Sequence, residues 1–218
     1  MDRALIFDLD GTLVDTLPDI AAAMNAALAE RRCPPLPREA YRSRVGWGSL
    51  ELSRLSLPED RRTDEEIRLL ERSFRRLYQA APAVRSVPFP GIPALLASLQ
   101  ARGIPLSVLT NKPDEAVSPL LAALFPETRF FRALGADDRR PRKPDPAAAL
   151  EIARDLGLAP DRVFFVGDSA VDIRTARNAG MVPIGVAWGY RDISELEAEG
   201  ARSIARTPED LLAILSEP

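Results

Sequence analysis

The chain has 218 residues, of which 46% are hydrophobic and 28% charged, and its formal net charge is −3. This composition is typical of a soluble globular protein with one sizeable core, or with one core and an insertion. The small negative charge gives no general affinity for nucleic acid or for an anionic membrane. No apolar run approaches the roughly 20 residues that a membrane span needs. We therefore expect neither nucleic acid nor a membrane as a partner.

Residue counts narrow the chemistry further. The chain has no histidine, which excludes a histidine general base and a histidine-ligated zinc site. The single Cys33 excludes an internal disulfide and is typical of a protein of the reducing cytoplasm, which is the location we expect. Nearly all basic residues are arginines, so the two lysines, Lys112 and Lys143, are expected at positions that need a compact ammonium group.

Strand-like runs alternate with helical patterns over most of the chain. The strand patterns occupy residues 4–8, 104–110, 163–167 and 182–187, with a weaker one at 203–205. The helical patterns between the later runs occupy residues 91–101, 113–124, 145–157 and 170–179. In the third of these helices, Asp145 is the expected N-cap, Pro146 the first helical residue and Gly157 the stop. The alternation predicts an α/β fold with a parallel, Rossmann-like sheet and helices on both faces.

One segment, residues 18–80, breaks this alternation, because its pattern is helical throughout and shows no convincing strand. The proline-rich residues 82–90 are typical of a connector. We therefore expect a helical cap inserted after the first strand, with hinges at residues 14–17 and 82–90. The predicted domains are an α/β core of residues 1–14 and 88–218 and a helical cap domain of residues 15–87.

The most informative motif, Asp8-Leu9-Asp10-Gly11-Thr12, ends the first strand. Side chains at positions i and i+2 of an extended segment share a face, so the two carboxylates lie close together and need a cation or a proton between them. The pair suits a divalent metal, a nucleophilic carboxylate beside an acid/base carboxylate, or both. A solvated acidic turn or a calcium loop would contain the same residues, although the mostly apolar continuation lacks the further ligands of a calcium loop.

Polar clusters also follow the other predicted strands. They are Thr110-Asn111-Lys112, Arg142-Lys143-Pro144 and Gly167-Asp168-Ser169, with Asp172 one helical turn after Asp168. Each cluster alone has an ordinary explanation, such as a helix cap or a basic turn. In an open parallel sheet, however, ligands bind at the carboxyl ends of the strands, so four clusters at one edge favour a shared site.

The chemistry of these clusters is mutually consistent. Asp8, Asp168 and a carbonyl of the first strand offer hard oxygen ligands, which suit a Mg²⁺ ion that keeps waters and a phosphate oxygen. Thr110 offers a hydroxyl and Lys143 a point charge to a phosphoryl group. Phosphoryl transfer needs little beyond such positioning and charge neutralisation around an in-line nucleophile.

The order DLDGTLVD, LTNK, RKPDP and VGDSAVD resembles the haloacid dehalogenase superfamily, specifically its phosphoglycolate phosphatase-like branch with a helical, C1-type cap. Gly189-Tyr190-Arg191 also resembles that branch, whereas the insert is matched only by its position and helical character. The resemblance implies a Mg²⁺-dependent phosphatase that hydrolyses a small phosphorylated metabolite, with 2-phosphoglycolate favoured, through an aspartyl-phosphate. A phosphosugar mutase, a pyrophosphatase and a non-catalytic binding or regulatory protein remain alternatives, and the expected form is a monomer or homodimer.

The resemblance also implies roles for single residues. Asp8 would be the nucleophile, and Asp10 would protonate the leaving oxygen and then deprotonate the hydrolytic water. Dehalogenases of the superfamily lack an acid at the second position, so Asp10 implies phosphate-ester or anhydride chemistry. The expected phosphate-binding residues are Thr110, Asn111 and Lys143, with Asn111 orienting Asp8 or the substrate. The expected metal ligands are Asp8, the backbone carbonyl of Asp10 and Asp168, supported by Asp172 and Ser169.

Substrate choice is expected to come from the cap, where Arg44-Val45-Gly46-Trp47-Gly48 precedes a helix predicted to begin at Ser49. The glycines permit close backbone approach, the tryptophan offers a wall, and the helix start offers N–H groups to an anion. Arg44, Gly46 and Trp47 are therefore the candidate specificity residues. A tight turn with a buried tryptophan explains the same residues.

Overall fold

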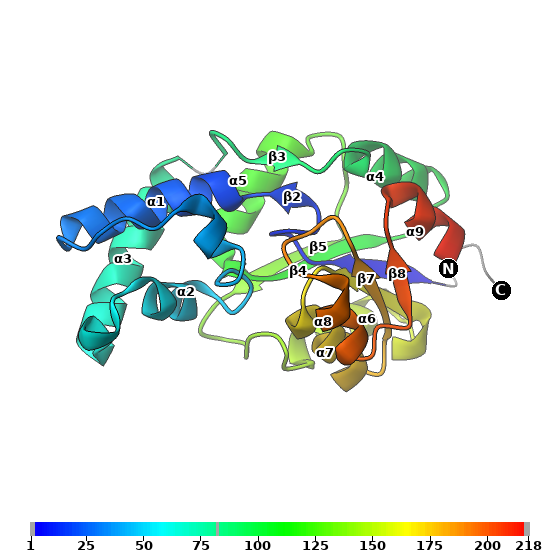
Figure 1. Ribbon diagram of the computed structural model, residues 1–218. Helices are drawn as coiled ribbons and strands as arrows, with labels where there is room; N and C mark the ends of the chain where they lie inside the picture. Colours follow the sequence, from blue (N-terminus) through cyan, green and yellow to red (C-terminus); the bar gives the residue numbers. More distant parts are fainter. Residues whose placement is uncertain (1–2, 82, 216–218) are drawn as a thin grey trace.

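Six parallel strands form one sheet in the order β5-β4-β1-β6-β7-β8, in a computed structural model that describes residues 3–81 and 83–215 (Figure 1). The strands are β1 (Ala4–Phe7), β4 (Leu106–Pro113), β5 (Arg132–Ala136), β6 (Val163–Gly167), β7 (Val182–Val186) and β8 (Ser203–Ala205). The central strands β1, β4 and β6 are almost completely buried. Burial on both sides is what their continuous apolar runs predict for a parallel sheet, and the α/β prediction is confirmed.

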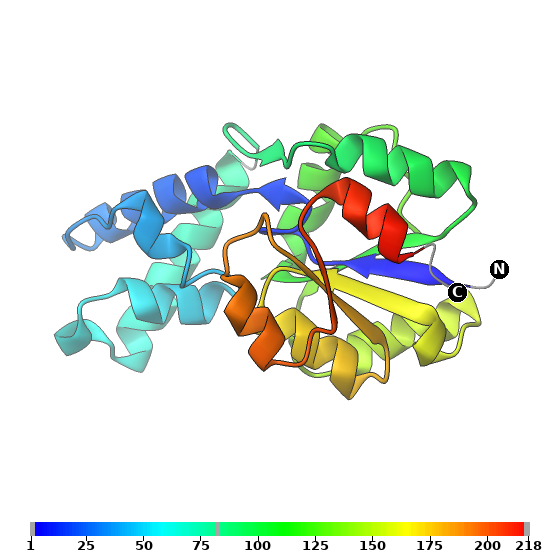
Figure 2. The ribbon, with the colours of Figure 1, turned by 45° about the vertical axis from the view of Figure 1, so that its right-hand side comes forward.

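Helices cover both faces of this sheet (Figure 2). They are α4 (Ile92–Ala101), α5 (Asp114–Leu124), α6 (Ala147–Leu156), α7 (Ala170–Asn178), α8 (Ile193–Ala198) and α9 (Pro208–Ile214), and a 3₁₀ turn, η3 (Pro160–Arg162), precedes β6. Side chains of β1 alternate between the two faces. Leu5 and Phe7 pack with residues of α4, α5 and α9, whereas Ile6 packs with residues of α6 and α7.

Residues 17–80 form helices that stay outside the sheet and surround a core of their own (Figure 1). The elements are α1 (Leu17–Glu30), η1 (Arg38–Tyr41), α2 (Ser49–Ser56), η2 (Glu59–Arg61) and α3 (Asp64–Ala80). Met24, Leu28 and Leu70 are completely buried in that core. The chain enters this segment through β2 (Val14–Asp15) and leaves it through β3 (Val87–Pro88). These two short strands pair in antiparallel orientation.

The structure differs from the sequence prediction at several elements. Strand β5 was not expected, because the sequence RALGA lacks β-branched and aromatic residues and lies at a sheet edge. The short helices α8 and α9 were not expected either. Strand β4 extends to Pro113, where an irregular register still pairs it with Ala136. Of the expected connector 82–90, residue 82 lies outside the described residues and Val87–Pro88 forms β3.

Helix α6 begins one residue later than expected. Pro146 is its N-cap and Ala147 its first residue, while the Asp145 carboxylate accepts the Ala147 N–H at 2.9 Å. Its predicted stop is confirmed, since Gly157 adopts the left-handed conformation with φ of 68°. Among the described residues, no helix is long and apolar enough to cross a membrane.

Candidate active site

The predicted polar residues meet at the carboxyl edge of the sheet. Asp8 follows β1, Thr110 lies in β4, and Asp168 follows β6. Lys143 comes from the loop between β5 and α6 and reaches the same place. All four residues are buried, with at most 6% of the surface of each residue exposed. Polar groups are seldom buried to this extent without a structural or chemical reason.

The Lys143 ammonium lies between two carboxylates. Its nitrogen is 2.7 Å from Oδ1 of Asp8 and 2.7 Å from Oδ1 of Asp172. The other oxygen of Asp172 accepts hydrogen bonds from the backbone N–H and the hydroxyl of Ser169, which caps α7. Both oxygens of Asp172 are therefore used to hold Lys143 and the start of α7, which places Asp172 and Ser169 in a supporting position.

The Asp168 carboxylate is fixed by two donors. The backbone N–H of Tyr190 reaches Oδ2 at 2.7 Å, and the Thr12 hydroxyl reaches Oδ1 at 3.2 Å. The neighbouring backbone is glycine because a side chain does not fit. A Cβ on Gly11 would lie 2.4 Å from Asp168 Oδ2, and one on Gly189 would lie 2.2 Å from Asp168 Cβ.

The carboxylates fit a divalent cation. One oxygen each of Asp8, Asp168 and Asp172 lies within 4.8 Å of the others. Burial, opposed by the Lys143 ammonium and reinforced by Asp172, raises the pKa of Asp8 to about 7. Burial and the two neighbouring carboxylates raise the pKa of Asp168 to about 8. Such shifts are typical of a buried cluster in which three carboxylates outnumber one ammonium group, and its hard oxygen donors suit Mg²⁺. Since Asp172 is already engaged, Asp8 and Asp168 are the side chains that would hold the ion.

The Asp10 carboxylate is separate from this cluster. Its Oδ1 accepts a hydrogen bond from the Lys112 ammonium at 2.9 Å and another from the Thr16 hydroxyl at 2.7 Å. Burial alone would lower the pKa of Lys112, but Asp10 and Tyr78 more than offset this, so that the pKa lies above its usual value and the ammonium stays charged. The Asp10 side chain thus faces an organic cation, as expected for a group that is not a metal ligand.

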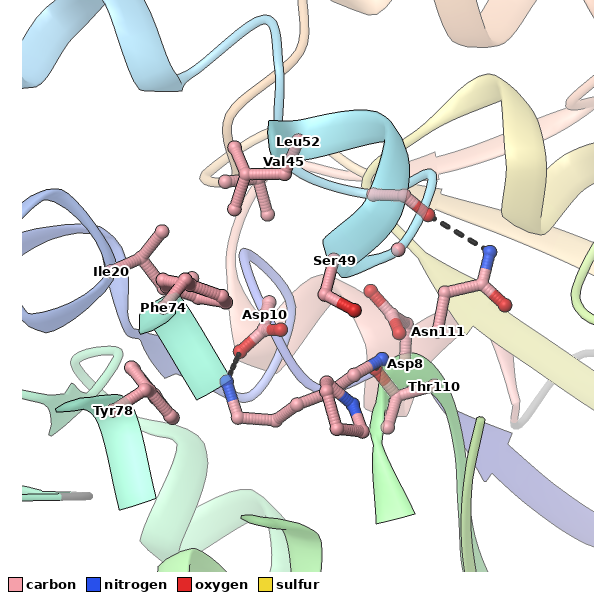
Figure 3. A pocket seen from close by; sticks show the side chains of 14 residues that line it. Asp8, Asp10, Ile20, Val45, Ser49, Leu52, Phe74, Tyr78, Thr110 and Asn111 are labelled. Carbon is pink, nitrogen blue, oxygen red and sulfur yellow. Dashed lines mark hydrogen bonds and ion pairs between the residues drawn. The ribbon is translucent and has the colours of Figure 1, made fainter. Parts of the chain in front are cut away.

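A pocket opens over Asp8 and Asp10 (Figure 3). Its floor is polar and comes from the sheet edge, with Thr110, Asn111 and Lys112 beside the two aspartates. The opposite wall comes from the segment 17–80 and is mostly apolar. It contains Ile20, Val45, Leu52, Phe74 and Tyr78, together with Gly46, Gly48 and Ser49.

Two of the expected specificity residues do not line this pocket. The Arg44 guanidinium donates to the backbone carbonyls of Leu55, at 3.0 Å, and Ala40, so it holds turns of the segment 17–80 together. Trp47 is 38% exposed and is not the wall that the sequence suggested. Gly46 does line the pocket, with φ of 116°, and α2 begins at Ser49 as predicted.

Asn111 lies in the pocket floor, but its amide is used elsewhere. Its Nδ2 donates to the carbonyls of Gly46, at 2.9 Å, and Lys143, at 3.0 Å, and its Oδ1 accepts the Lys143 N–H at 2.9 Å. Asn111 therefore does not orient Asp8 in this structure. It joins the loop that contains Gly46 to the loop that carries Lys143.

Several residues at this site were not identified as functional from the sequence. The Arg191 guanidinium donates to the carbonyls of Arg42, of Ser43 at 3.0 Å and of Val45 at 2.7 Å, which ties the loop after β7 to residues 42–45 of the helical segment. The Tyr190 hydroxyl accepts the N–H groups of residues 16 and 17 and donates to Asp15, at the start of the cap segment. The sequence signal for both was the motif Gly189-Tyr190-Arg191, whose role only the contacts reveal.

Comparisons with known proteins agree with this geometry. The model of the haloacid dehalogenase-like hydrolase family matches residues 3–180. Phosphoglycolate phosphatase of Escherichia coli (strain K12) is 34% identical over 235 residues, covering 99% of this chain and 93% of that protein. The Chromobacterium violaceum phosphoglycolate phosphatase is 36% identical over 200 residues, covering 90% of each.

A solved structure extends the comparison to the whole fold. A protein from Lactobacillus delbrueckii, proposed to be a phosphoglycolate phosphatase, aligns with a TM-score of 0.92 at 34% identity and covers 99% of both chains. The chain therefore belongs to the haloacid dehalogenase-like hydrolase family, in the phosphoglycolate phosphatase-like branch that its motifs indicate.

Proposed function

We propose that the chain is a Mg²⁺-dependent phosphatase that hydrolyses a small phosphorylated metabolite through an aspartyl-phosphate on Asp8. The observation that carries the proposal is the placement of Asp8 between the Lys143 ammonium, at 2.7 Å, and the buried Asp168 carboxylate, with Asp10 facing the same pocket. The Lys143 ammonium, together with a Mg²⁺ ion that Asp8 and Asp168 would hold, would keep Asp8 ionised and neutralise an incoming phosphoryl group.

The residues divide the reaction as follows. The Asp8 carboxylate attacks phosphorus while the bond to the leaving oxygen breaks, and Asp10 gives a proton to that oxygen. Asp10 then takes a proton from water as the water oxygen attacks the phosphorus of the aspartyl-phosphate, which releases phosphate and restores Asp8. Thr110 and Lys143 hold the phosphoryl oxygens during both steps. Bound Mg²⁺, held by Asp8, the Asp10 backbone carbonyl and Asp168, would supply further charge neutralisation.

The pocket favours a small substrate, and 2-phosphoglycolate is the one we propose. The relatives from E. coli and C. violaceum carry that activity in their names. The mostly apolar cap wall offers few partners to the hydroxyl groups of a sugar, whereas a two-carbon acid needs little space.

The proposal includes a division of labour between two domains, with residues 15–87 as a cap and residues 1–14 and 88–218 as the catalytic core. The apolar cluster that residues 17–80 form, joined by Ala116 and Tyr190 of the rest of the chain, supports this division. The cytoplasm as compartment and a monomer or homodimer as working form complete the proposal. The buried free thiol of Cys33 supports a reducing compartment.

A phosphate-release assay with Mg²⁺ tests the proposal, with 2-phosphoglycolate, pyrophosphate, nucleotides and sugar phosphates as substrates. The expected result is the highest kcat/KM for 2-phosphoglycolate and no turnover by Asp8→Asn. Preference for pyrophosphate would replace the substrate class, and isomerisation of a hexose phosphate without phosphate release would establish a mutase. No phosphate release from any substrate would leave a non-catalytic protein.

A further inference from the structure

Lys112 is a buried lysine outside the phosphate and metal contacts. It lies near the end of β4, and its side chain is only 3% exposed. Its ammonium donates to Oδ1 of Asp10 at 2.9 Å, in an ion pair whose other member is 10% exposed. An ion pair buried to this degree loses much hydration and contributes little net stability, so its presence calls for a chemical reason.

The contacts of Asp10 are strongly asymmetric. Lys112 and the Thr16 hydroxyl both donate to Oδ1, while no hydrogen bond from the described residues reaches Oδ2. In Figure 3 one Asp10 oxygen takes the bond from the ammonium, and the other turns into the pocket, toward Asp8. Two donors on one oxygen fix the rotation of the carboxylate and leave its second oxygen free to exchange a proton with a bound molecule.

The Lys112 ammonium is also in contact with the cap. Its nitrogen lies 4.4 Å from the centre of the ring of Tyr78. Tyr78 belongs to α3 and is 4% exposed. An ammonium over an aromatic face is attracted by the ring, more strongly where water is excluded. The position of Lys112 is thus set from both sides, by Asp10 on the core and by Tyr78 on the cap.

We propose that Lys112 is the positioning residue for Asp10, and that Tyr78 holds its ammonium in place when the cap lies on the core. The inference rests on the proposed function, because it assumes that Asp10 is the general acid and base. In the first step, the proton moves from Oδ2 of Asp10 to the leaving oxygen as the phosphorus–oxygen bond breaks. In the second step, Oδ2 takes a proton from the attacking water. Lys112 keeps its own protons throughout and touches neither the phosphorus nor the leaving group.

The dependence of the rate on the leaving group distinguishes this role from a structural one. An alkyl phosphate releases a strongly basic alkoxide and needs a proton from Asp10, whereas p-nitrophenyl phosphate releases a stable phenolate and does not. The test compares kcat/KM of wild type and Lys112→Met for ethyl phosphate and p-nitrophenyl phosphate with Mg²⁺. We expect a loss of about 10- to 100-fold for ethyl phosphate and of less than about threefold for p-nitrophenyl phosphate.

Asp10→Asn and two Tyr78 variants complete the experiment. Asp10→Asn is expected to show the same leaving-group dependence more strongly. Tyr78→Leu removes the ring and is expected to show it more weakly, whereas Tyr78→Phe retains the ring and is expected to keep the wild-type ratio between the two substrates. If Lys112→Met does not fold, the two Tyr78 variants and Thr16→Val replace it in the test, because Thr16→Val removes the other donor to Oδ1 of Asp10.

The outcomes distinguish the positioning role of Lys112 from the acid and base role of Asp10. Suppose that Asp10→Asn shows the leaving-group dependence but Lys112→Met lowers kcat/KM equally for both substrates, or for neither. The positioning role is then wrong and the proposed function stands. Thr16→Val and Tyr78→Leu decide in the same way if Lys112→Met does not fold. If Asp10→Asn itself lowers kcat/KM equally for both substrates, Asp10 is not the general acid, and the positioning role proposed for Lys112 is wrong as well.

Discussion

The Lys143 ammonium nitrogen lies 2.7 Å from Oδ1 of Asp8, although 135 residues separate the two in the chain. The contact is possible because Asp8 ends β1 and the loop between β5 and α6 returns to the same edge of the sheet. It gives the carboxylate that we propose as nucleophile a fixed cation on one side. Carboxylate oxygens of the buried Asp168 and Asp172 also lie within 4.8 Å of Asp8, so negative charge is crowded around the same group.

Removal of this ammonium should destabilise the protein in a pH-dependent way. In Lys143→Met the carboxylates of Asp8 and Asp172 lose their buried partner, which typically costs about 3–5 kcal/mol. The cost should be smaller at pH 6 than at pH 8, because the Asp8 carboxyl group, whose pKa is about 7 in the folded chain, can then take up a proton instead. Urea denaturation of the metal-free protein at both pH values measures this difference. An equal loss at both values would contradict the electrostatic account of the cluster.

The stability of the metal-free protein should fall as the pH rises. Asp8 and Asp168 have pKa values of about 7 and about 8 in the folded chain, against an ordinary value of 3.8. Between about pH 4 and pH 8 the folded state therefore binds protons that the unfolded state does not, and each rise in pH favours unfolding. Mg²⁺ should abolish this trend, since it takes the place of the protons.

Thermal unfolding from pH 5 to 8.5, with EDTA or with excess Mg²⁺, checks that prediction. We expect Tm in EDTA to decrease across this range and the stabilisation by Mg²⁺ to increase with pH. The same dependence on pH in both buffers would show that the carboxylates of Asp8 and Asp168 do not form the metal site.

Gly11→Ala should weaken metal binding. Gly11 has φ of 92°, and a Cβ there would meet Asp168 Oδ2 at 2.4 Å, so the carboxylate must move. Gly103→Ala is the matched control, because Gly103 has φ of 70° but no atom within 4 Å of its Cβ position. Both variants carry about 1–3 kcal/mol of backbone strain. Only Gly11→Ala should lose Mg²⁺ affinity, by about 10-fold or more, in isothermal titration calorimetry. Equal affinities of the two variants would contradict this role of the close approach.

Arg191→Met should loosen the contact between core and cap. The variant loses the hydrogen bonds from the guanidinium to the carbonyls of Arg42, Ser43 and Val45. Hydrogen bonds from a charged group contribute about 1.5–3 kcal/mol each. A net loss close to that of a single such bond, about 1.4 kcal/mol, would already raise KM about tenfold if it weakens the contact of the cap with the core.

Steady-state kinetics of Arg191→Met with 2-phosphoglycolate measures this effect. Arg174→Met is the control, since Arg174 lies on α7 and pairs with Glu199 at the end of α8. It should leave KM unchanged. A similar KM for all three proteins would show that the contacts of Arg191 do not govern access to the pocket.

Much of the fold was predictable because strong local patterns agree with it. The apolar runs around Ile6 and Phe165 predict buried strands, and the spacing of Leu95 and Leu99 predicts a helix face. Strand β5 was missed because Ala133 and Gly135 carry no strand preference, and only pairing with β4 makes the segment extended.

The candidate site was likewise predictable only in part. Reading the residues at each strand end identified Asp8, Thr110, Lys143 and Asp168, because the carboxyl ends of parallel strands meet at one edge. Such a rule names residues but not their partners. It could not show that Lys112 pairs with Asp10 across 102 positions of sequence. Nor could it show that Arg44 bonds to backbone carbonyls within the cap, because loop and cap contacts depend on tertiary packing.

The proposed mechanism requires that Asp8 becomes phosphorylated during turnover. The most direct measurement is mass spectrometry of acid-quenched Asp10→Asn after reaction with p-nitrophenyl phosphate and Mg²⁺. This substrate needs no proton for its leaving group, whereas hydrolysis of the intermediate needs Asp10 as a base, so the phospho-enzyme should accumulate. The account predicts one phosphoryl group on the peptide that contains Asp8, and none in the double variant that also carries Asp8→Asn. An unmodified Asp8 peptide, together with normal turnover by Asp8→Asn, would contradict it.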